Sequence, residues 1–214
     1  MTIIFTYNRF SMLNSLLNEL KGEGITVIDD GSDYDPSPLL DRCEYLRFPH
    51  QGKQGFYKLW DYALKICKKS DATWFMFSPD DITDVQLDKI KATTKDLSVF
   101  AFNYVNAGKD RGWTDVQWKD TVINGVECYE MGYVDGVFVT DRTTLELLDF
   151  TVHPVPQSRF VIPNISSGVG CQLSRQLHNL GVPMYLSKKS LAYHGDHESV
   201  MHPDERLKHP LISV

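Results

Sequence analysis

The amino-acid sequence predicts an α/β fold in which helices flank a mostly parallel central sheet. Short apolar strands alternate with helices whose apolar residues recur on one face, a pattern typical of parallel βαβ units. Two of these strands end in adjacent carboxylates, Asp29 with Asp30 and Asp80 with Asp81. Ligands bind at the carboxyl ends of parallel strands, so these observations predict a binding site along that edge of the sheet.

The first half of the chain supplies the pattern most clearly. Residues 2–7, TIIFTY, are β-branched and aromatic and predict a strand, and residues 10–20 carry leucines at helical spacing. Residues 25–28 predict a second strand. Residues 50–56, HQGKQGF, predict a glycine-flanked loop, and the apolar face from Phe56 to Cys67 predicts a helix after it.

The second half continues the alternation of strands and helices but contains a long irregular stretch. We expect irregular hairpins and loops over residues 106–133, where glycines are frequent. The expected strands are residues 73–77, 98–105, 133–140, 182–187 and 191–195. The expected helices are residues 85–94, 141–150 with Asp141 as N-cap, and 170–180 ended by Gly181.

Composition narrows the classes of protein that the chain can be. Its 214 residues are 42% hydrophobic, which is enough to bury the core of one domain. A net charge of −6 and a pI near 5.6 argue against a broad basic surface for nucleic acid. The four cysteines form no CxxC pair, and no apolar run approaches the ~20 residues that span a bilayer. We therefore expect reduced thiols in a soluble cytoplasmic protein without a transmembrane segment.

Asp80 and Asp81 are the strongest chemical signal in the sequence. Adjacent carboxylates repel each other and gain little from folding unless a positive group lies beside them. A divalent cation would supply that charge, and carboxylate oxygens suit Mn²⁺ or Mg²⁺. The alternative interpretation is a helix N-cap followed by an exposed acidic turn. The position of the pair at a strand end favours the metal site.

Four motifs, in their order along the chain, resemble those of GT-A-fold glycosyltransferases, most closely those of family 2. They are TYNR at 6–9, VIDDGS at 27–32, SPDD at 78–81 and YHGD at 193–196. The resemblance implies a GT-A, Rossmann-like fold over residues 1–214 as a single domain. Within it we expect a nucleotide-binding half over about 1–105, and an acceptor-binding half over about 106–214 with a smaller irregular β and loop region and a C-terminal segment.

The resemblance also implies a nucleotide-sugar donor, for which we expect a UDP-sugar, bound together with Mn²⁺ or Mg²⁺. The residues that would contact the nucleoside are Thr6, Tyr7, Arg9, and Asp29 or Asp30. Asp81 would bind the metal with Asp80 beside it, and His194 would be a late metal ligand. Lys53 would either add a positive charge near the donor or be a solvated loop lysine.

Two departures from the family pattern concern the chemistry. Ser78 stands where the family has its first acidic residue, so the ribose contact which that residue often supplies is in doubt. Residues 168–171 lack the acidic pair that supplies the base in inverting members. Either Asp135, Asp196 or Glu198 serves as the base, or the enzyme retains configuration and needs no dedicated protein base.

The sequence leaves three functions open. The leading one is metal-dependent transfer of a sugar to an acceptor hydroxyl, on a glycan or on a hydroxymethylated base in phage DNA. The second is a sugar nucleotidyltransferase, which would require a glycine-rich, lysine-containing phosphate loop after the first strand. Residues 6–13, TYNRFSML, lack such a loop. The third is a nucleotide-sugar binding protein that has lost catalysis. A DNA acceptor would need a basic groove, with these candidates: Lys65, Lys68, Lys69, Arg111, Lys119 and Lys188.

Overall fold

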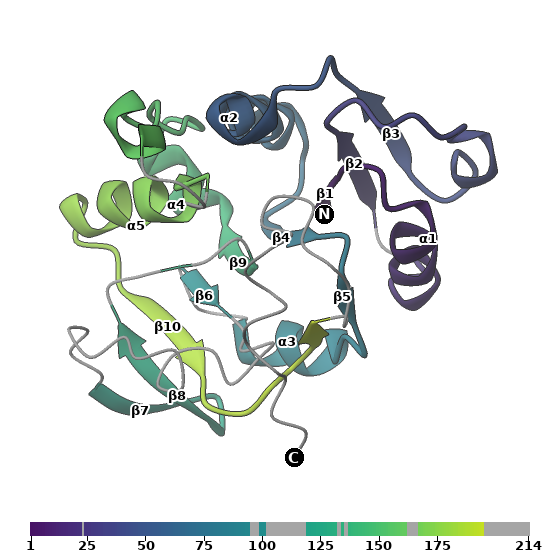
Figure 1. Ribbon diagram of the computed structural model, residues 1–214. Coiled ribbons are helices and arrows are strands. Elements are labelled where there is room, and N and C mark those ends of the chain that lie inside the picture. The colour runs from purple at the N-terminus through teal and green to yellow at the C-terminus, as the bar shows by residue number, and fades with distance from the viewer. Residues whose placement is uncertain are drawn as a thin grey trace.

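The computed structural model describes residues 1–22, 24–94, 99–101, 119–131, 134, 137–161 and 167–194, and these form a layered α/β structure (Figure 1). The central sheet of the described chain has nine strands. In sheet order they are β3 (Glu44–Arg47), β2 (Ile25–Asp29), β1 (Thr2–Thr6), β4 (Trp74–Pro79), β9 (Phe138–Asp141), β6 (Val99–Ala101), β10 (Met184–Ser187), β8 (Val126–Met131) and β7 (Lys119–Ile123). A second, small sheet pairs β5 (Ile82–Thr83) with β11 (Tyr193–His194).

The strand directions confirm the predicted mostly parallel sheet. β1 is parallel to β2 and β4, β2 is parallel to β3, and β10 is parallel to β6. β9 is antiparallel to β4 and β6, and β8 is antiparallel to β10 and β7. Among the described strands, only β9 and β8 therefore run against the common direction.

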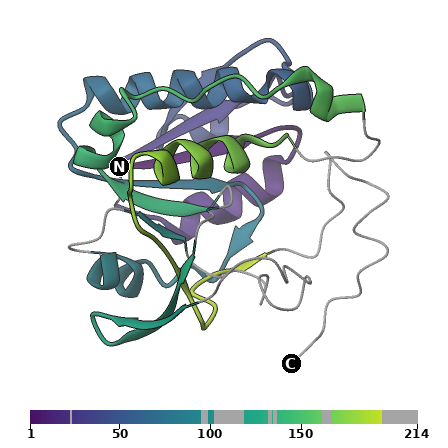
Figure 2. The same ribbon diagram turned by 90° about the vertical axis from the view of Figure 1, so that its left-hand side faces the viewer.

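Helices cover both faces of the sheet because each presents one apolar side to it. One face is covered by α2 (Gly52–Lys69), α4 (Arg142–Leu147) and α5 (Val169–Asn179), and the opposite face by α1 (Phe10–Glu19) and α3 (Leu87–Thr94). Figure 2 shows α2 and α5 above the sheet and α3 below it. Two short 3₁₀ helices, η1 (Ser37–Leu39) and η2 (Gln157–Val161), lie in the connections.

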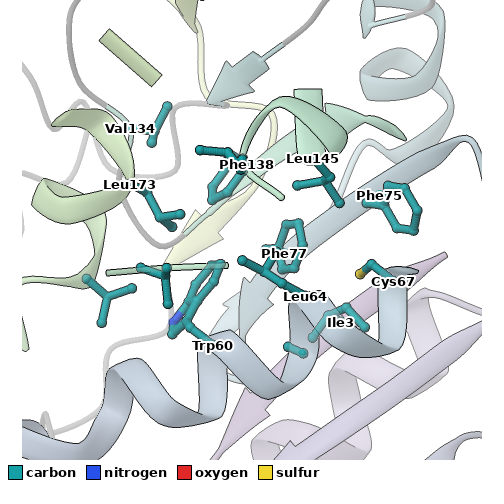
Figure 3. Packing of buried hydrophobic residues seen from close by; sticks show 14 of the residues in the cluster. Ile3, Trp60, Leu64, Cys67, Phe75, Phe77, Val134, Phe138, Leu145 and Leu173 are labelled. Carbon is teal, nitrogen blue, oxygen red and sulfur yellow. The ribbon is translucent and has the colours of Figure 1, made fainter. Parts of the chain in front are cut away.

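An aromatic group fixes α2 against the centre of the sheet (Figure 3). The Trp60 ring stacks on Phe5, Phe77 and Phe138 at centroid distances of 4.5, 5.1 and 5.9 Å. These rings come from β1, β4 and β9, so one buried side chain of the helix ties three strands together. Offset aromatic stacking adds to the free energy gained from burying this area.

The helix α2 begins earlier than the sequence indicates. It starts at Gly52, inside the stretch 50–56 predicted as a loop. The carboxylate of Asp30 accepts hydrogen bonds from the amides of Gln51, at 2.5 Å, and Gly52, at 3.1 Å. These contacts satisfy amides that a helix start leaves unpaired, and the negative charge favours the positive end of the helix dipole. A residue distant in the sequence therefore lets the helix begin at Gly52.

Residues 119–131 form a regular hairpin where the sequence indicates irregular structure. Asn124 and Gly125 connect β7 to β8 with φ angles of 47° and 80°. Positive φ at both turn residues matches the type I′ turn, whose twist suits a tight hairpin. The hairpin extends the central sheet at its β10 side.

The helix ends in the second half follow their predicted signals. The side chain of Asp141 accepts a 2.7 Å hydrogen bond from the amide of Thr144, so this residue is the N-cap of α4. The helix α5 ends at Asn179, and Gly181 follows with a φ of 68°. Both signals are local in the chain, which is why sequence reading finds them.

All four cysteines lie in the described part of the chain, and each is a free thiol there. Burial raises the pKa of Cys67 to about 12 and that of Cys128 to about 11. Among the described helices, none combines the length and the apolar character that crossing a membrane requires.

We expect Trp60→Ala to lower the free energy of unfolding by about 3–5 kcal/mol, because it empties a site that three strands share. Tyr62→Ala on the same helix is the matched control, since Tyr62 is 42% exposed and Trp60 is 2% exposed. The control should lose less than about 1 kcal/mol. Urea denaturation measures both values, and equal losses would contradict this account of the core.

Candidate functional site

The predicted site lies where the parallel strands β3, β2, β1 and β4 end. Thr6 is in register with Asp29, and Asp29 with Arg47. Phe5 is in register with Pro79, so Asp80 follows at the same edge. The motifs that follow β1, β2 and β4 therefore meet at one edge of the sheet, as the sequence predicts.

Asp80 and Asp81 are buried at this edge, each 3% exposed. The hydroxyl of Thr6 donates a 2.6 Å hydrogen bond to Asp80 Oδ2. Arg9 Nη1 lies 3.3 Å from Asp80 Oδ1 and 2.5 Å from Asp81 Oδ2, so one guanidinium bridges the two carboxylates. Thr6 and Arg9, both predicted to contact the nucleoside, thus contact the aspartate pair.

The alternative interpretation of this pair, an exposed acidic turn at a helix start, is wrong. The residues after Asp81 form β5 and not a helix, and α3 begins only at Leu87. Across the small sheet Ile82 pairs with His194. Both carboxylates are buried, and the buried β5 residue Ile82 follows them.

The environment of Asp80 favours its protonated form. Burial raises the pKa of this carboxyl to about 7, the neighbouring charge of Asp81 adds to the rise, and the contacts with Thr6 and Arg9 oppose it. Burial works against the charge of Arg9, but the carboxylates of Asp81 and Asp80 outweigh it and raise the pKa of Arg9. Asp80, Asp81 and Arg9 therefore form one charged cluster, in which the guanidinium compensates part of the negative charge of both carboxylates.

The donor chemistry at Asp80 and Asp81 fits a Mn²⁺ or Mg²⁺ ion that binds together with a nucleotide. The described residues contain no group of three or more His, Cys, Asp or Glu side chains that could hold a metal. Mg²⁺ in nucleotide sites commonly takes one or two protein carboxylates, while phosphate oxygens and water complete its shell. The fit requires the guanidinium of Arg9 to leave the oxygens that it contacts here.

Asp29 is fully buried and holds neighbouring parts of the chain together. Its Oδ1 accepts hydrogen bonds from the amide and the hydroxyl of Ser32, at 3.0 and 2.5 Å. Its Oδ2 accepts from the Tyr45 hydroxyl at 2.7 Å and from Arg47 Nε at 2.6 Å. Sequence reading missed Tyr45 and Arg47, although their spacing of two in a strand puts them on one face.

The carboxylate of Asp30 lies at the start of α2 and beside the stacked rings of Tyr7 and His50. Besides the amides of Gln51 and Gly52, its carboxylate contacts His50 Nδ1 at 3.1 Å. The His50 ring stacks on Tyr7 with centroids 4.3 Å apart and planes 20° apart. Burial raises the pKa of Asp30, and the amide hydrogen bonds oppose that rise. Sequence reading missed His50, because the stack joins loops 43 residues apart.

Gly31 lets the segment with His50 pack against the turn after β2. Its φ is 83°, and a Cβ at this position would lie 2.8 Å from the His50 amide nitrogen. Any other residue would therefore strain the turn and push the segment away. The glycine of VIDDGS thus positions the aromatic pair.

The remaining predicted residues are placed only in part. Lys53 lies half-buried in the first turn of α2. The backbone of His194 pairs with Ile82, which brings its main chain beside the residue that follows Asp81, and its side chain lies outside the described structure. Asp135 and Asp196 also lie outside the described residues. The roles of these four residues stay predictions.

We predict that Asp80→Asn makes the metal-free protein more stable at pH 8 and that this gain is smaller at pH 5. The folded-state pKa of Asp80, about 7, lies above its ordinary value of 3.8, so the folded state holds this proton more tightly than the unfolded chain does. The resulting stabilisation is complete below pH 3.8 and is lost as the pH rises through about 7. An asparagine carries no charge at either pH, so the variant avoids this loss of stability, which is on the order of 1–3 kcal/mol.

Urea denaturation in a chelator at the two pH values measures this effect. Asp84→Asn is the matched control, because Asp84 is exposed three residues after Asp81. The stability difference between wild type and Asp80→Asn should change with pH, while that between wild type and the control should not. Parallel pH profiles for all three proteins would contradict the assignment.

No protein-family model and no curated protein sequence matches this chain. Its fold is similar to that of CMP:2-keto-3-deoxy-manno-octonic acid synthetase in a structure complexed with CTP. The match has a TM-score of 0.51 and 10% sequence identity, and it covers 87% of this chain and 88% of the synthetase chain. It shows that the two chains share an α/β fold, here a mixed, mostly parallel sheet flanked by helices with a smaller antiparallel sheet beside it.

Proposed function

We propose that this protein is a metal-dependent glycosyltransferase that moves a sugar from a nucleotide-diphosphate sugar, with a UDP-sugar as the expected donor, to an acceptor hydroxyl. The observation that carries the proposal is the meeting of three motifs at one sheet edge: residues 6–9, 27–32 and 78–81. They are distant in the chain, and their order is the one expected from the family 2 resemblance. Because these distant motifs meet at one place, chance occurrence of short motifs explains the resemblance less well.

The proposed donor site has a phosphate end and a base end. At the phosphate end, Asp80 and Asp81 would hold Mn²⁺ or Mg²⁺, which when bound would stabilise the negative charge that grows on the departing diphosphate. At the base end, the ring of Tyr7 offers a stacking surface and Asp30 an acceptor for a ring N–H. Asp29 already accepts four protein hydrogen bonds, so we assign the base contact to Asp30.

The proposed reaction forms a bond between the acceptor oxygen and the anomeric carbon of the sugar. The bond from that carbon to the β-phosphate oxygen breaks, and its electron pair goes to the diphosphate. The acceptor hydroxyl loses its proton, and Asp135, Asp196 and Glu198 stay the predicted candidates for a protein base. The first turn of α5, which corresponds to the family's acidic pair, contains no carboxylate. The stereochemical outcome therefore stays open between inversion and retention.

A glycan is the better supported acceptor, although a hydroxymethylated DNA base stays in the proposal. A DNA acceptor would need lysines gathered into an open basic groove. Four of the candidate lysines each pair with a carboxylate, at 2.6, 3.1, 3.0 and 3.1 Å: Lys65, Lys68, Lys119 and Lys188. Such pairs reduce the positive field that steers DNA. Arg111 lies outside the described residues.

A sugar nucleotidyltransferase is the second candidate function, and the fold comparison favours it over the glycosyltransferase. The matched synthetase has a name that describes formation of a CMP-sugar, and its structure contains CTP. The local sequence argues the other way, because β1 leads directly into α1 through residues 7–9 without a glycine-rich, lysine-containing phosphate loop.

We expect Asp81→Asn to abolish sugar transfer, with a fall of at least about 100-fold, because the amide removes a charge that holds the cation beside the diphosphate. Asp84→Asn, exposed and nearby, should keep wild-type activity. The assay follows UDP release from a panel of UDP-sugars with Mn²⁺ and glycan acceptors. Near wild-type transfer by a folded Asp81→Asn protein would overturn the proposed role of the pair.

The released product separates the candidate functions. A glycosyltransferase releases the nucleoside diphosphate when it is given a nucleotide sugar and an acceptor, because the bond to the anomeric carbon breaks. A nucleotidyltransferase releases pyrophosphate when it is given a nucleoside triphosphate and a sugar or sugar phosphate. We predict UDP release without pyrophosphate release. Pyrophosphate release would establish the second candidate, and tight UDP binding without either product would indicate a binding protein.

A further inference from the structure

The guanidinium of Arg9 lies in the place where a cation of the proposed donor site is needed. Its Nη1 lies 2.5 Å from Asp81 Oδ2 and 3.3 Å from Asp80 Oδ1, and the side chain is only 11% exposed. A single positive nitrogen that contacts oxygens of two carboxylates has the position of a bridging metal ion. A divalent cation held by Asp80 and Asp81 would therefore compete with this nitrogen for the same oxygens.

We propose that Arg9 is an internal counter-ion that takes the cation's place while the donor site is empty and moves onto the diphosphate when metal and nucleotide bind. This inference rests on the proposed function, because it assumes a nucleotide diphosphate at this edge. It assigns a positioning role to Arg9 and predicts how the binding of metal depends on the binding of nucleotide. The metal binds weakly alone and tightly with the nucleotide.

The charge balance of the cluster requires this order. Asp80 and Asp81 together carry at most two negative charges, which Arg9 offsets in part. A divalent cation bound alone would add two positive charges and would have to displace the guanidinium from its carboxylate partners. Uncompensated buried charge is costly. A diphosphate restores the balance, because its oxygens accept hydrogen bonds from the guanidinium and share the metal with the carboxylates.

The position of Arg9 in the chain suits such a movement. It is the last of the three residues between β1 and α1 and occupies the N-cap position, and its side chain makes no cap hydrogen bond to the helix. Its backbone carbonyl accepts from the Leu13 amide at 3.1 Å, so the main chain is held while the side chain can turn. The first amides of α1 lie at the same edge and favour a nearby anion.

Arg9→Gln tests the competition directly, because it removes the positive charge but keeps a polar side chain. Binding of Mn²⁺ to the protein, measured by electron paramagnetic resonance with and without UDP, reports the metal without any need for turnover. We expect the variant to bind Mn²⁺ alone about tenfold more tightly than the wild type does. We also expect UDP to improve Mn²⁺ binding less in the variant than in the wild type, since positive coupling is lost.

Two further variants control the experiment. Arg9→Lys keeps the charge without the planar fork, so its affinity for Mn²⁺ alone should lie between those of wild type and Arg9→Gln, and it serves if the glutamine variant does not fold. Arg42→Gln removes an arginine that donates hydrogen bonds to Asn14 and Asn18 of α1 and to the Pro38 carbonyl of η1, and it should match the wild type. Thermal melting of each protein verifies that it is folded.

The outcomes separate this inference from the proposed function. If Arg9→Gln binds Mn²⁺ alone no more tightly than the wild type does, Arg9 is a permanent structural counter-ion and the inference is overturned. Tighter Mn²⁺ binding by the variant supports the inference even if no sugar transfer is found with any donor. Transfer by the wild type together with unchanged Mn²⁺ binding by the variant keeps the function and rejects the inference.

Discussion

The burial of two adjacent carboxylates at the end of β4 is the constraint on which the site depends. Asp80 and Asp81 are each 3% exposed, so water cannot screen their mutual repulsion. Compensation comes from Thr6 and Arg9, which lie at the end of β1 and just after it. The pairing of β1 with β4 thus brings Thr6 and Arg9 to the carboxylates. The same contact between strands therefore supports both the sheet and the candidate site.

A second pair of carboxylates stabilises the neighbouring strand end in a different way. Asp29 joins the end of β2 to β3 through Tyr45 and Arg47, and Asp30 holds the first amides of α2. Both networks use hydrogen bonds from the protein to satisfy the oxygens of buried carboxylates. The result is a sheet edge on which the Tyr7 ring and the aspartate pair are held by separate sets of contacts. A ligand that spans this edge would meet groups that are already positioned.

Sequence reasoning predicted the features that depend on local signals and missed those that depend on distant pairs. The α/β class, the positions of the strands before Tyr7, Asp30 and Asp80, and the N-cap at Asp141 follow from periodicity and short-range capping. The contact of Arg9 with Asp81 joins residues 72 positions apart, and the stack of His50 on Tyr7 joins two loops. Neither contact produces a periodic pattern in the sequence. The early start of α2 belongs to the same class, since Asp30 caps it from another element.

Ser78, where the sequence resemblance implies an acidic residue, is a neutral group just before the aspartate pair. Ser78 is 1% exposed, and its hydroxyl donates a 2.8 Å hydrogen bond to the Pro79 carbonyl, so this position holds a neutral group that bonds to the backbone. A carboxylate at this buried position, two residues before Asp80, would need a positive partner of its own, and Arg9 already contacts both aspartates. The serine therefore adds no further negative charge to a strand end where one guanidinium already faces two carboxylates.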